Sequence, residues 1–248
     1  MLLHSLDLNA VLADEMGLGK TVQALAFLRL LAKRENARGP HLIVVPASVV
    51  ENWRREAEKW LPDFVVLVYQ GSQQEREEMR AQFKSLGPDI VITTYTHFDR
   101  DSAKADRAFL YRIPFKVTVF DEAHALKNPK NNRYQRLLKV QTQRRLLLSG
   151  TPIQNNVQEL LALLVFCFPA IFSDSHLDFG EIVKEDPERF RRVLAPFILR
   201  RVKADVLAHL APKTEEVVFL DMLPNQYAEY QKLVKELGKQ DKFVWVFF

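Results

Sequence analysis

Apolar positions along the chain follow two patterns that alternate from one segment to the next. Short runs rich in Val, Ile, Leu and Phe are typical of strands that are buried on both faces. They occur at Ala10–Ala13, His41–Val45, Phe64–Tyr69, Asp89–Thr93, Lys116–Asp121 and Arg144–Ser149. Longer amphipathic segments predict helices at Lys20–Arg34, Val49–Trp60, Gln73–Leu86, Ser102–Tyr111 and Arg133–Val140. This alternation predicts an α/β fold, a doubly wound parallel sheet with helices on both faces.

The pattern changes after Ser149. Further helices are predicted over Val157–Phe168, Glu188–Leu194 and Asn225–Lys239, with a strand over Lys213–Leu220. We therefore divide the chain into an α/β lobe over residues 1–168 and a C-terminal helical extension over residues 169–248. The apolar segment Phe243–Phe248 is typical of a strand whose partner lies elsewhere.

Composition narrows the class of protein only in part. A hydrophobic fraction of 48% and a charged fraction of 27% are ordinary for a soluble globular protein, and a net charge of +4 neither requires nor excludes a polyanionic partner. The single cysteine, Cys167, has no disulfide partner in the chain and lies in an apolar run, so we interpret it as a core residue in a reducing compartment. No stretch approaches the roughly 20 apolar residues of a membrane span, and no signal peptide is recognisable.

A glycine-bearing turn joins the first predicted strand to the first predicted helix. It reads Asp14-Glu15-Met16-Gly17-Leu18-Gly19-Lys20-Thr21. Glycines allow the backbone to point N–H groups at phosphate oxygens, and the amino terminus of the helix adds partial positive charge. In such a loop the lysine reaches the β- and γ-phosphates and the threonine hydroxyl binds Mg²⁺. The turn therefore predicts a nucleoside triphosphate site, although Asp14 stands where the general pattern has its first glycine.

Two adjacent carboxylates follow a later strand. Asp121 and Glu122 come directly after the apolar segment Lys116–Phe120, at the carboxyl edge of the predicted sheet, where ligands bind in folds of this class. One carboxylate can hold the magnesium ion and the other can orient and deprotonate an attacking water. We predict Asp121 for the metal and Glu122 for the base, with Lys20 completing the catalytic set. His124, two residues further on, is consistent with a capping or packing role as well as with a relay of nucleotide state.

These segments resemble the Swi/Snf-related helicase-like ATPases of helicase superfamily two. Asp14–Thr21 resembles that family's own phosphate loop, its aspartate included, and Asp121–His124 resembles its acidic box of the DEAH type. Leu148–Asn155 is similar to its third motif, and Phe197–Lys203 to the stretch that leads out of its first lobe. Two further segments resemble stretches that touch the DNA backbone: Ile43–Pro46 with Asn52-Trp53, and Ile92–Tyr95.

The resemblance implies a RecA-like first lobe that uses ATP and Mg²⁺, tracks double-stranded DNA, acts on nucleosomes and works in the nucleus. It implies that hydrolysis is coupled to DNA movement through His124, Ser149, Gly150 and Thr151. The residues implied to contact DNA are Pro46, Asn52, Trp53, Thr93, Thr94 and Tyr95. Two basic clusters could also neutralise phosphates, although a solvated helix face explains either cluster equally well. They comprise Lys127, Lys130, Arg133, Arg136 and Lys139 in the first, and Arg189, Arg191, Arg192, Arg200, Arg201 and Lys203 in the second.

Parts of the family's pattern are not found in the sequence. The adenine-recognising glutamine segment is not recognisable, and neither is the second lobe with its arginine finger, which is worth roughly 10³ to 10⁵ in rate. We therefore interpret the chain as a fragment or shortened form that includes the start of the linker to an absent second lobe. Alone, it is expected to bind nucleotide weakly and to hydrolyse it very slowly. The alternative is a non-catalytic module that binds DNA or a protein through the surface of the lobe.

Overall fold

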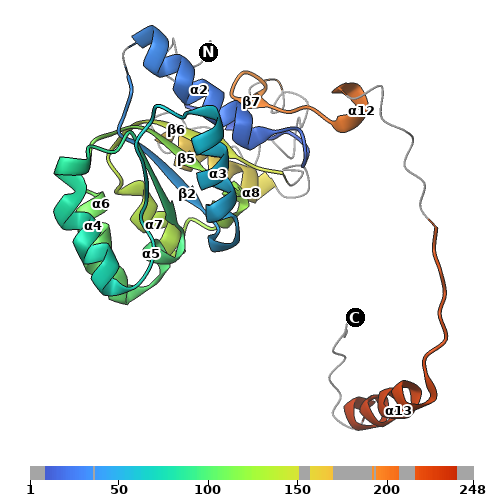
Figure 1. Cartoon of the computed structure of the whole chain (residues 1–248). Coiled ribbons are helices and arrows are strands. Elements are labelled where there is room, and N and C mark those ends of the chain that lie inside the picture. Colours follow the sequence, from blue (N-terminus) through green and yellow to red (C-terminus); the bar gives the residue numbers. More distant parts are fainter. Residues whose placement is uncertain are drawn as a thin grey trace. The chain divides into compact units, whose positions relative to one another are not determined.

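Seven parallel strands form one sheet in the first compact unit of the chain, Met1–Ala208 (Figure 1). The computed structural model describes residues 9–35, 37–150, 157–169, 192, 194–206 and 216–238. The strand order is β3-β4-β2-β5-β6-β1-β7, and every pairing is parallel. The strands are β1 (Ala10–Leu12), β2 (His41–Val45), β3 (Val66–Val68), β4 (Ile90–Thr94), β5 (Phe115–Phe120), β6 (Thr142–Leu148) and β7 (Ile198–Leu199).

Helices connect the strands and cover both faces of the sheet. Among the described residues of this unit, the α-helices are α2 (Lys20–Glu35), α3 (Val50–Trp60), α4 (Gln73–Leu86), α5 (Thr96–Asp99), α6 (Lys104–Leu110), α7 (Asn132–Leu138), α8 (Val157–Cys167) and α12 (Lys203–Val206). Short 3-10 turns lie at Ala47–Val49, Asp101–Ala103 and Ala123–Leu126. The doubly wound α/β prediction is confirmed, and the elements predicted before residue 169 are found to within two residues at each end.

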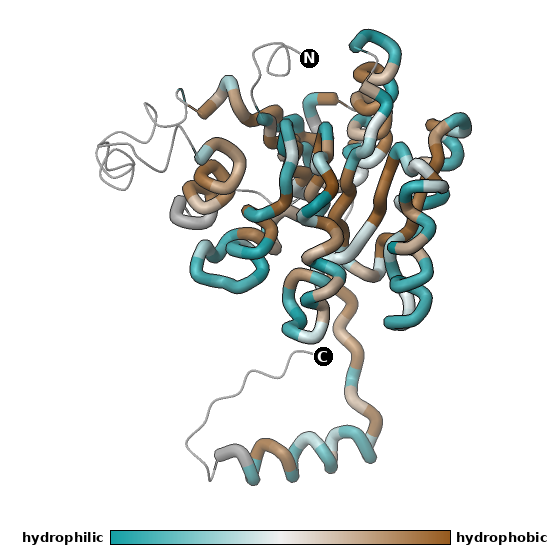
Figure 2. The backbone as a smooth tube through the Cα atoms, turned by 90° about the vertical axis from the view of Figure 1, so that its left-hand side faces the viewer, coloured by the Kyte–Doolittle hydropathy of each residue, from teal (hydrophilic) through white to brown (hydrophobic). Residues whose placement is uncertain are grey.

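Side chains along the central strands point alternately to the two faces of the sheet and form two hydrophobic cores, one on each face. In β2, Leu42 and Val44 pack into one buried cluster together with α7 and α8, whereas Ile43 and Val45 pack into the other together with α2 and α3. This is why the strands read as continuous apolar runs, because both faces are covered. Figure 2 shows this distribution: the strands at the centre are mainly hydrophobic, and many residues of the surrounding helices are hydrophilic.

The stability of helix α4 comes more from the capping of its ends than from a buried face. Ser72 accepts a hydrogen bond from the backbone N–H of Glu75, and the Glu75 carboxylate accepts one from the backbone N–H of Ser72, forming a capping box. The helix ends at Gly87, whose φ of 56° is left-handed. Only Met79 and Phe83 pack, partly buried, against the core.

The region after residue 168 contributes one strand to the sheet. β7 pairs with β1, and the first compact unit of the chain runs to Ala208; the division of the chain at residue 168 stays a prediction. The predicted strand Lys213–Leu220 is wrong over its described part, because Glu216–Leu220 has no regular secondary structure and pairs with no described strand. Apolar residues alone do not make a strand without a paired neighbour. Most of Glu188–Leu194 and all of Phe243–Phe248 lie outside the described residues.

The second unit, His209–Phe248, contains α13 (Pro224–Gly238), in agreement with the helix predicted over Asn225–Lys239. Its side chains Tyr227, Tyr230, Leu233 and Val234 recur at helical spacing and are all exposed. Among the described residues, no helix has both the length and the apolar character needed to cross a membrane.

Candidate functional site

Three strands bring the predicted site segments to one edge of the sheet. β6 lies between β1 and β5, with Leu12 paired to Leu148 and Phe120 paired to Leu147. Because all three strands run in the same direction, the segments that follow them leave at the same level. Neighbouring strands are about 4.8 Å apart, so the ends of β1 and β5 are separated by about 10 Å. The loop after β1, the acidic pair after β5 and the segment after β6 therefore share one rim.

The loop between β1 and α2 has the backbone of a phosphate cradle. Gly17 (φ 88°) and Gly19 (φ 75°) both adopt left-handed conformations that disfavour other residues. Helix α2 begins at Lys20, directly followed by Thr21. The Lys20 ammonium donates hydrogen bonds to the carbonyl oxygens of Asp14 (2.9 Å) and Glu15 (3.4 Å). The Lys20 side chain therefore lies against the loop that precedes α2.

Asp14 is fully buried and paired with Arg201. One carboxylate oxygen accepts the backbone N–H of Arg201 at 3.0 Å, both oxygens accept its Nε at 3.1 Å, and Gln23 Nε2 donates to the second oxygen at 3.2 Å. Burial alone would raise the pKa of Asp14, but the hydrogen bonds from Arg201 and Gln23 outweigh it and lower that pKa. Asp14, which stands where the general phosphate-loop pattern has a glycine, therefore binds the distant segment that contains Arg201.

That distant segment runs alongside β1 and on past the phosphate loop. Successive backbone N–H groups of Val11, Ala13 and Glu15 donate to carbonyl oxygens on Phe197, Leu199 and Arg201 at 2.8–3.0 Å. One more hydrogen bond follows this series: the backbone N–H of Lys203 donates to the Glu15 carboxylate at 2.7 Å. Its side chain comes so near Gly17 that a Cβ there would lie 3.2 Å from Lys203 Cε. The sequence placed Arg201 in a basic cluster and in Phe197–Lys203, which resembles the stretch leading out of the family's first lobe, but it did not pair Arg201 with Asp14. The aspartate in place of glycine was the available signal for that pairing.

At the end of β5, Asp121 is held from three sides. Its carboxylate accepts hydrogen bonds from Trp53 Nε1 at 2.7 Å and from the backbone N–H of Glu122 at 2.9 Å. Its carbonyl oxygen accepts the Tyr95 hydroxyl at 2.7 Å. Glu122 itself has a φ of 49°, the only positive φ among the described non-glycine residues, which marks a constrained turn. His124 Nδ1 lies 3.2 Å from Glu122 Oε2.

The segment after β6 lies against the phosphate loop. The backbone N–H of Ser149, a buried residue, donates to the carbonyl oxygen of Leu12 at 3.0 Å. A Cβ on Gly150 would lie 2.7 Å from Met16 Cγ and 3.2 Å from Lys20 Nζ. Of the predicted coupling residues, Gly150 thus lies beside Lys20 and Ser149 beside the end of β1, whereas Thr151 lies outside the described residues.

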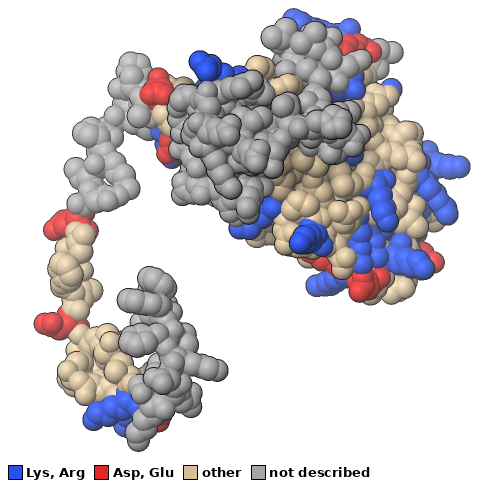
Figure 3. Space-filling view, turned by 180° about the vertical axis from the view of Figure 1, so that it is seen from behind, with Lys and Arg blue, Asp and Glu red and all other residues tan. Residues whose placement is uncertain are grey.

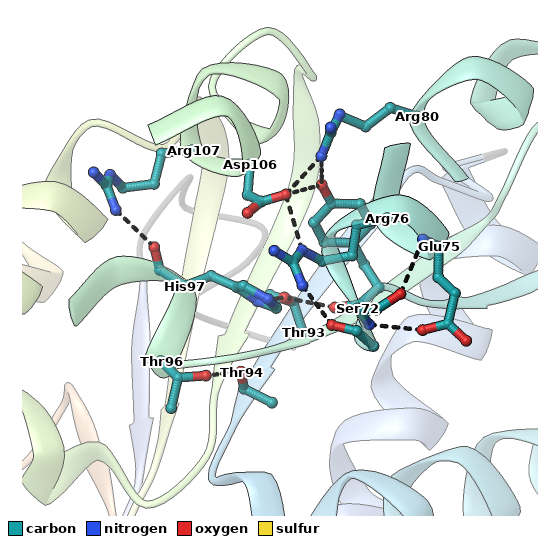
Figure 4. A network of polar contacts seen from close by, with 12 residues as sticks. Ser72, Glu75, Arg76, Arg80, Thr93, Thr94, Thr96, His97, Asp106 and Arg107 are labelled. Atoms are coloured by element: carbon teal, nitrogen blue, oxygen red, sulfur yellow. Dashed lines mark hydrogen bonds and ion pairs between the residues drawn. The ribbon is translucent and has the colours of Figure 1, made fainter. Parts of the chain in front are cut away.

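The predicted DNA-contacting residues divide into exposed and buried sets. Asn52 is exposed and Pro46 is half-buried, but Trp53, Thr93, Thr94 and Tyr95 are buried and present no surface to DNA. The two threonine hydroxyls form internal hydrogen bonds, that of Thr93 with His97 Nδ1 (2.9 Å) and that of Thr94 with the Thr96 hydroxyl (Figure 4). These four side chains are covered by neighbouring elements of the lobe, and their contact with DNA stays a prediction.

Two of the basic residues after the acidic box are engaged within the protein. Arg133 binds both carboxylate oxygens of Asp99 at 2.8 and 2.7 Å, and Arg136 donates to the carbonyl oxygens of Phe98 and Asp99. On the face seen in Figure 3, basic and acidic side chains are interspersed. The solvated or internally paired interpretation of this cluster is therefore the better one for Arg133 and Arg136.

With this geometry in place, a family profile described as the SNF2-related domain matches residues 2–244. The chain belongs to the SNF2-related family. It is 42% identical over 254 residues to the human SWI/SNF-related matrix-associated actin-dependent regulator of chromatin subfamily A containing DEAD/H box 1, covering 96% of this chain and 24% of that protein. It is also 42% identical to Protein CHROMATIN REMODELING 19 of Arabidopsis thaliana, covering 92% of this chain and 32% of that protein.

Solved structures agree with this assignment. The SNF2-related chain superposes on the Sulfolobus solfataricus SWI2/SNF2 ATPase core in complex with double-stranded DNA with a TM-score of 0.71 and 31% identity. The match covers 96% of this chain and 50% of that one, and the sheet of this chain corresponds to the first, RecA-like lobe of the core. The chain thus spans only part of the length of the relatives that it matches.

The residues of this SNF2-related lobe fit a magnesium-bound nucleoside triphosphate. Each carboxylate oxygen has two lone pairs, and each oxygen of Asp121 uses one for the contacts described above, which leaves one on each for a metal or its water. Mg²⁺ typically binds through one or two carboxylates together with substrate phosphates. The loop of Gly17 and Gly19 supplies the concave backbone that phosphates require.

Proposed function

We propose that this chain binds ATP with Mg²⁺ and serves as the first lobe of a DNA-dependent translocase that remodels chromatin in the nucleus. The observation that carries the proposal is the common rim, where the loop of Lys20 and the pair Asp121/Glu122 leave parallel strands at the same level. Three relatives point to the biological class, since they are named as a chromatin regulator, a chromatin remodelling protein and an ATP-dependent helicase.

Each residue on the rim has a separate task in this proposal. Lys20 exchanges its contacts with the carbonyl oxygens of Asp14 and Glu15 for the β- and γ-phosphates, and the loop from Asp14 to Thr21 surrounds them. Thr21 and Asp121 hold Mg²⁺, which when bound neutralises phosphate charge. Glu122 orients the attacking water and accepts its proton, while His124 lies within reach of the Glu122 carboxylate.

Coupling to DNA is assigned to the segment after β6 and to exposed positions on the same edge. Gly150 lies beside Lys20, so displacement of the lysine by nucleotide changes the space available to Gly150, and we assign the coupling to Ser149, Gly150 and Thr151. Pro46 and Asn52 are the two predicted DNA-contacting residues with accessible side chains. Contact with double-stranded DNA and with nucleosomes through this surface is consistent with the DNA complex of the Sulfolobus solfataricus core.

Binding of nucleotide by the full chain is the direct test. A fluorescent ATP analogue titrated with and without Mg²⁺ is expected to bind, and Lys20→Ala is expected to weaken binding by at least about tenfold, because a hydrogen bond to charged phosphate is lost. Lys33→Ala is the matched control, since Lys33 is an exposed lysine in the last turn of the same helix. Equal binding by the two variants would exclude the assigned phosphate loop.

Hydrolysis is tested once a second lobe is joined to the chain. Glu122→Gln is expected to keep nucleotide binding and to lose DNA-stimulated hydrolysis. Intact single-turnover hydrolysis in this variant would exclude Glu122 as the base. Binding without any DNA-stimulated turnover would instead favour the non-catalytic binding module.

A further inference from the structure

Two aromatic side chains from separate segments converge on Asp121. Trp53, in α3, donates its indole N–H to the carboxylate, and Tyr95, directly after β4, donates its hydroxyl to the backbone carbonyl. β4 and β5 flank β2, whose last residue Val45 is followed by the loop that leads into α3. Both aromatic residues lie in segments for which the sequence predicted only contact with DNA.

We propose that Trp53 is a positioning residue that fixes the Asp121 carboxylate in the orientation needed to hold Mg²⁺, with Tyr95 anchoring the backbone of the same residue. This inference rests on the proposed function, since it assigns to Trp53 a task within the magnesium–nucleotide site. Trp53 touches neither nucleotide nor metal in this proposal and acts only through Asp121.

The carboxylate has little rotational freedom left. One oxygen accepts the backbone N–H of Glu122 at 2.9 Å and the other accepts Trp53 Nε1 at 2.7 Å, so the two donors determine the plane of the group. Their two contacts leave one lone pair free on each oxygen. Residues that orient a metal-binding side chain in this way typically change metal affinity by about 10–100-fold when they are replaced.

Trp53 is itself immobilised. Only 1% of its surface is exposed, and it packs in the core that α2 and α3 form with β2 and β4. A buried indole N–H needs an acceptor, but a backbone carbonyl would satisfy it equally well. Here the acceptor is the carboxylate at the end of β5, which ties the position of that carboxylate to the position of α3.

Tyr95 is anchored in a comparable way. The ring is buried, the Arg133 guanidinium lies 5.3 Å from its centroid, and Arg133 is in turn held by both oxygens of Asp99. Side chain and backbone of Asp121 are thus fixed from two different elements.

The test compares Trp53→Phe with Trp60→Phe in the full chain. Trp60 lies on the same helix, and its Nε1 also donates to a carboxylate, that of Glu56 at 2.8 Å, but this pair is exposed and includes no residue of the acidic box. The two substitutions therefore remove the same N–H donor and differ in which carboxylate loses it. Binding of a fluorescent ATP analogue is measured as a function of Mg²⁺ concentration, with the melting temperature of each variant recorded.

Trp53→Phe is expected to raise the Mg²⁺ concentration for half-maximal enhancement of binding by about tenfold or more, while binding without Mg²⁺ stays unchanged. Trp60→Phe is expected to change neither. A lower melting temperature for Trp53→Phe would follow from the smaller ring and does not decide the question. An unchanged Mg²⁺ dependence, or an equal loss with and without Mg²⁺, would overturn the positioning role.

Tyr95→Phe provides a second variant if Trp53→Phe does not fold. It removes the hydroxyl and keeps the ring, and it is expected to shift the Mg²⁺ dependence in the same direction; no shift would overturn the anchoring role of Tyr95. The wild-type chain and Lys20→Ala separate the two levels of inference. If the wild-type chain fails to bind nucleotide, the proposed function itself fails. If it binds and Trp53→Phe leaves the Mg²⁺ dependence unaltered, only the positioning role is excluded.

Discussion

The carboxylate of Asp14 accepts hydrogen bonds from both the backbone N–H and the guanidinium of Arg201, a residue 187 positions further along the chain. Asp14 is fully buried, whereas the Arg201 side chain is 40% exposed. The pair therefore connects the start of the phosphate loop to the segment that pairs with β1 as strand β7 and continues into α12.

Arg201→Ala is expected to destabilise the chain by about 2 kcal/mol, because it leaves a buried carboxylate with fewer donors. Arg54→Ala is the control: Arg54 binds Glu51 and Glu58 on the surface of α3, where such pairs contribute about 0–1 kcal/mol. The double variant Asp14→Gly with Arg201→Ala is expected to be less destabilised than the sum of the two single variants. The free energy of unfolding of each variant is measured by urea denaturation. If the losses of the two single variants add up to the loss of the double variant, Asp14 and Arg201 do not interact.

Gly150→Ala is expected to weaken nucleotide binding several-fold with little loss of stability. The added Cβ would come too near Met16 and Lys20, but both contacts involve flexible side chains that can move, and the lysine moves away from its place on the rim. Gly87→Ala is the opposite case: its Cβ meets nothing within 4 Å, yet the φ of 56° strains any other residue, at a cost of about 1 kcal/mol. Calorimetry and nucleotide titration should therefore rank the two variants in opposite orders.

His41 is expected to make stability depend on pH between about 4 and 6.5. Burial lowers its pKa to about 4 from an ordinary 6.5, so in this window the unfolded chain binds a proton that the folded chain does not. The stabilisation is complete above pH 6.5 and decreases as the pH falls, by about 3 kcal/mol in total at pH 4. Unfolding free energies at pH 7 and pH 4.5, measured by urea denaturation, should differ less for His41→Leu than for the wild type.

Asp106→Ala is expected to destabilise the lobe by about 3 kcal/mol without changing the Mg²⁺ dependence of nucleotide binding. The buried Asp106 accepts hydrogen bonds from Tyr69, Arg76 and Arg80, and its loss leaves these three donors without their shared acceptor (Figure 4). Tyr69→Phe, which removes one donor and keeps the acceptor, should cost about 1 kcal/mol. If thermal unfolding shows similar losses for both variants, the network does not depend on Asp106.

The sequence also had limits in what it could assign to single side chains. Trp53, Thr93, Thr94 and Tyr95 were predicted to contact DNA because their segments resemble stretches that do so, and the segments do lie at the ligand edge. Which side of a strand end or helix a residue faces depends on what packs against it, and here that is the rest of the lobe. Asn52 and Trp53 are adjacent in sequence, yet one is exposed and the other is 1% exposed.

The sequence by itself determined the alternating strands and helices, the parallel sheet and the segments that carry the chemistry, because these depend on local periodicity and on short motifs. The tertiary structure alone decided which distant residues meet: Arg201 with Asp14, Trp53 and Tyr95 with Asp121, and β7 beside β1. Those contacts depend on strand order and on burial, which bring together residues that no local pattern relates. The same tertiary packing makes two predicted DNA contacts, Trp53 and Tyr95, into supports of the acidic box.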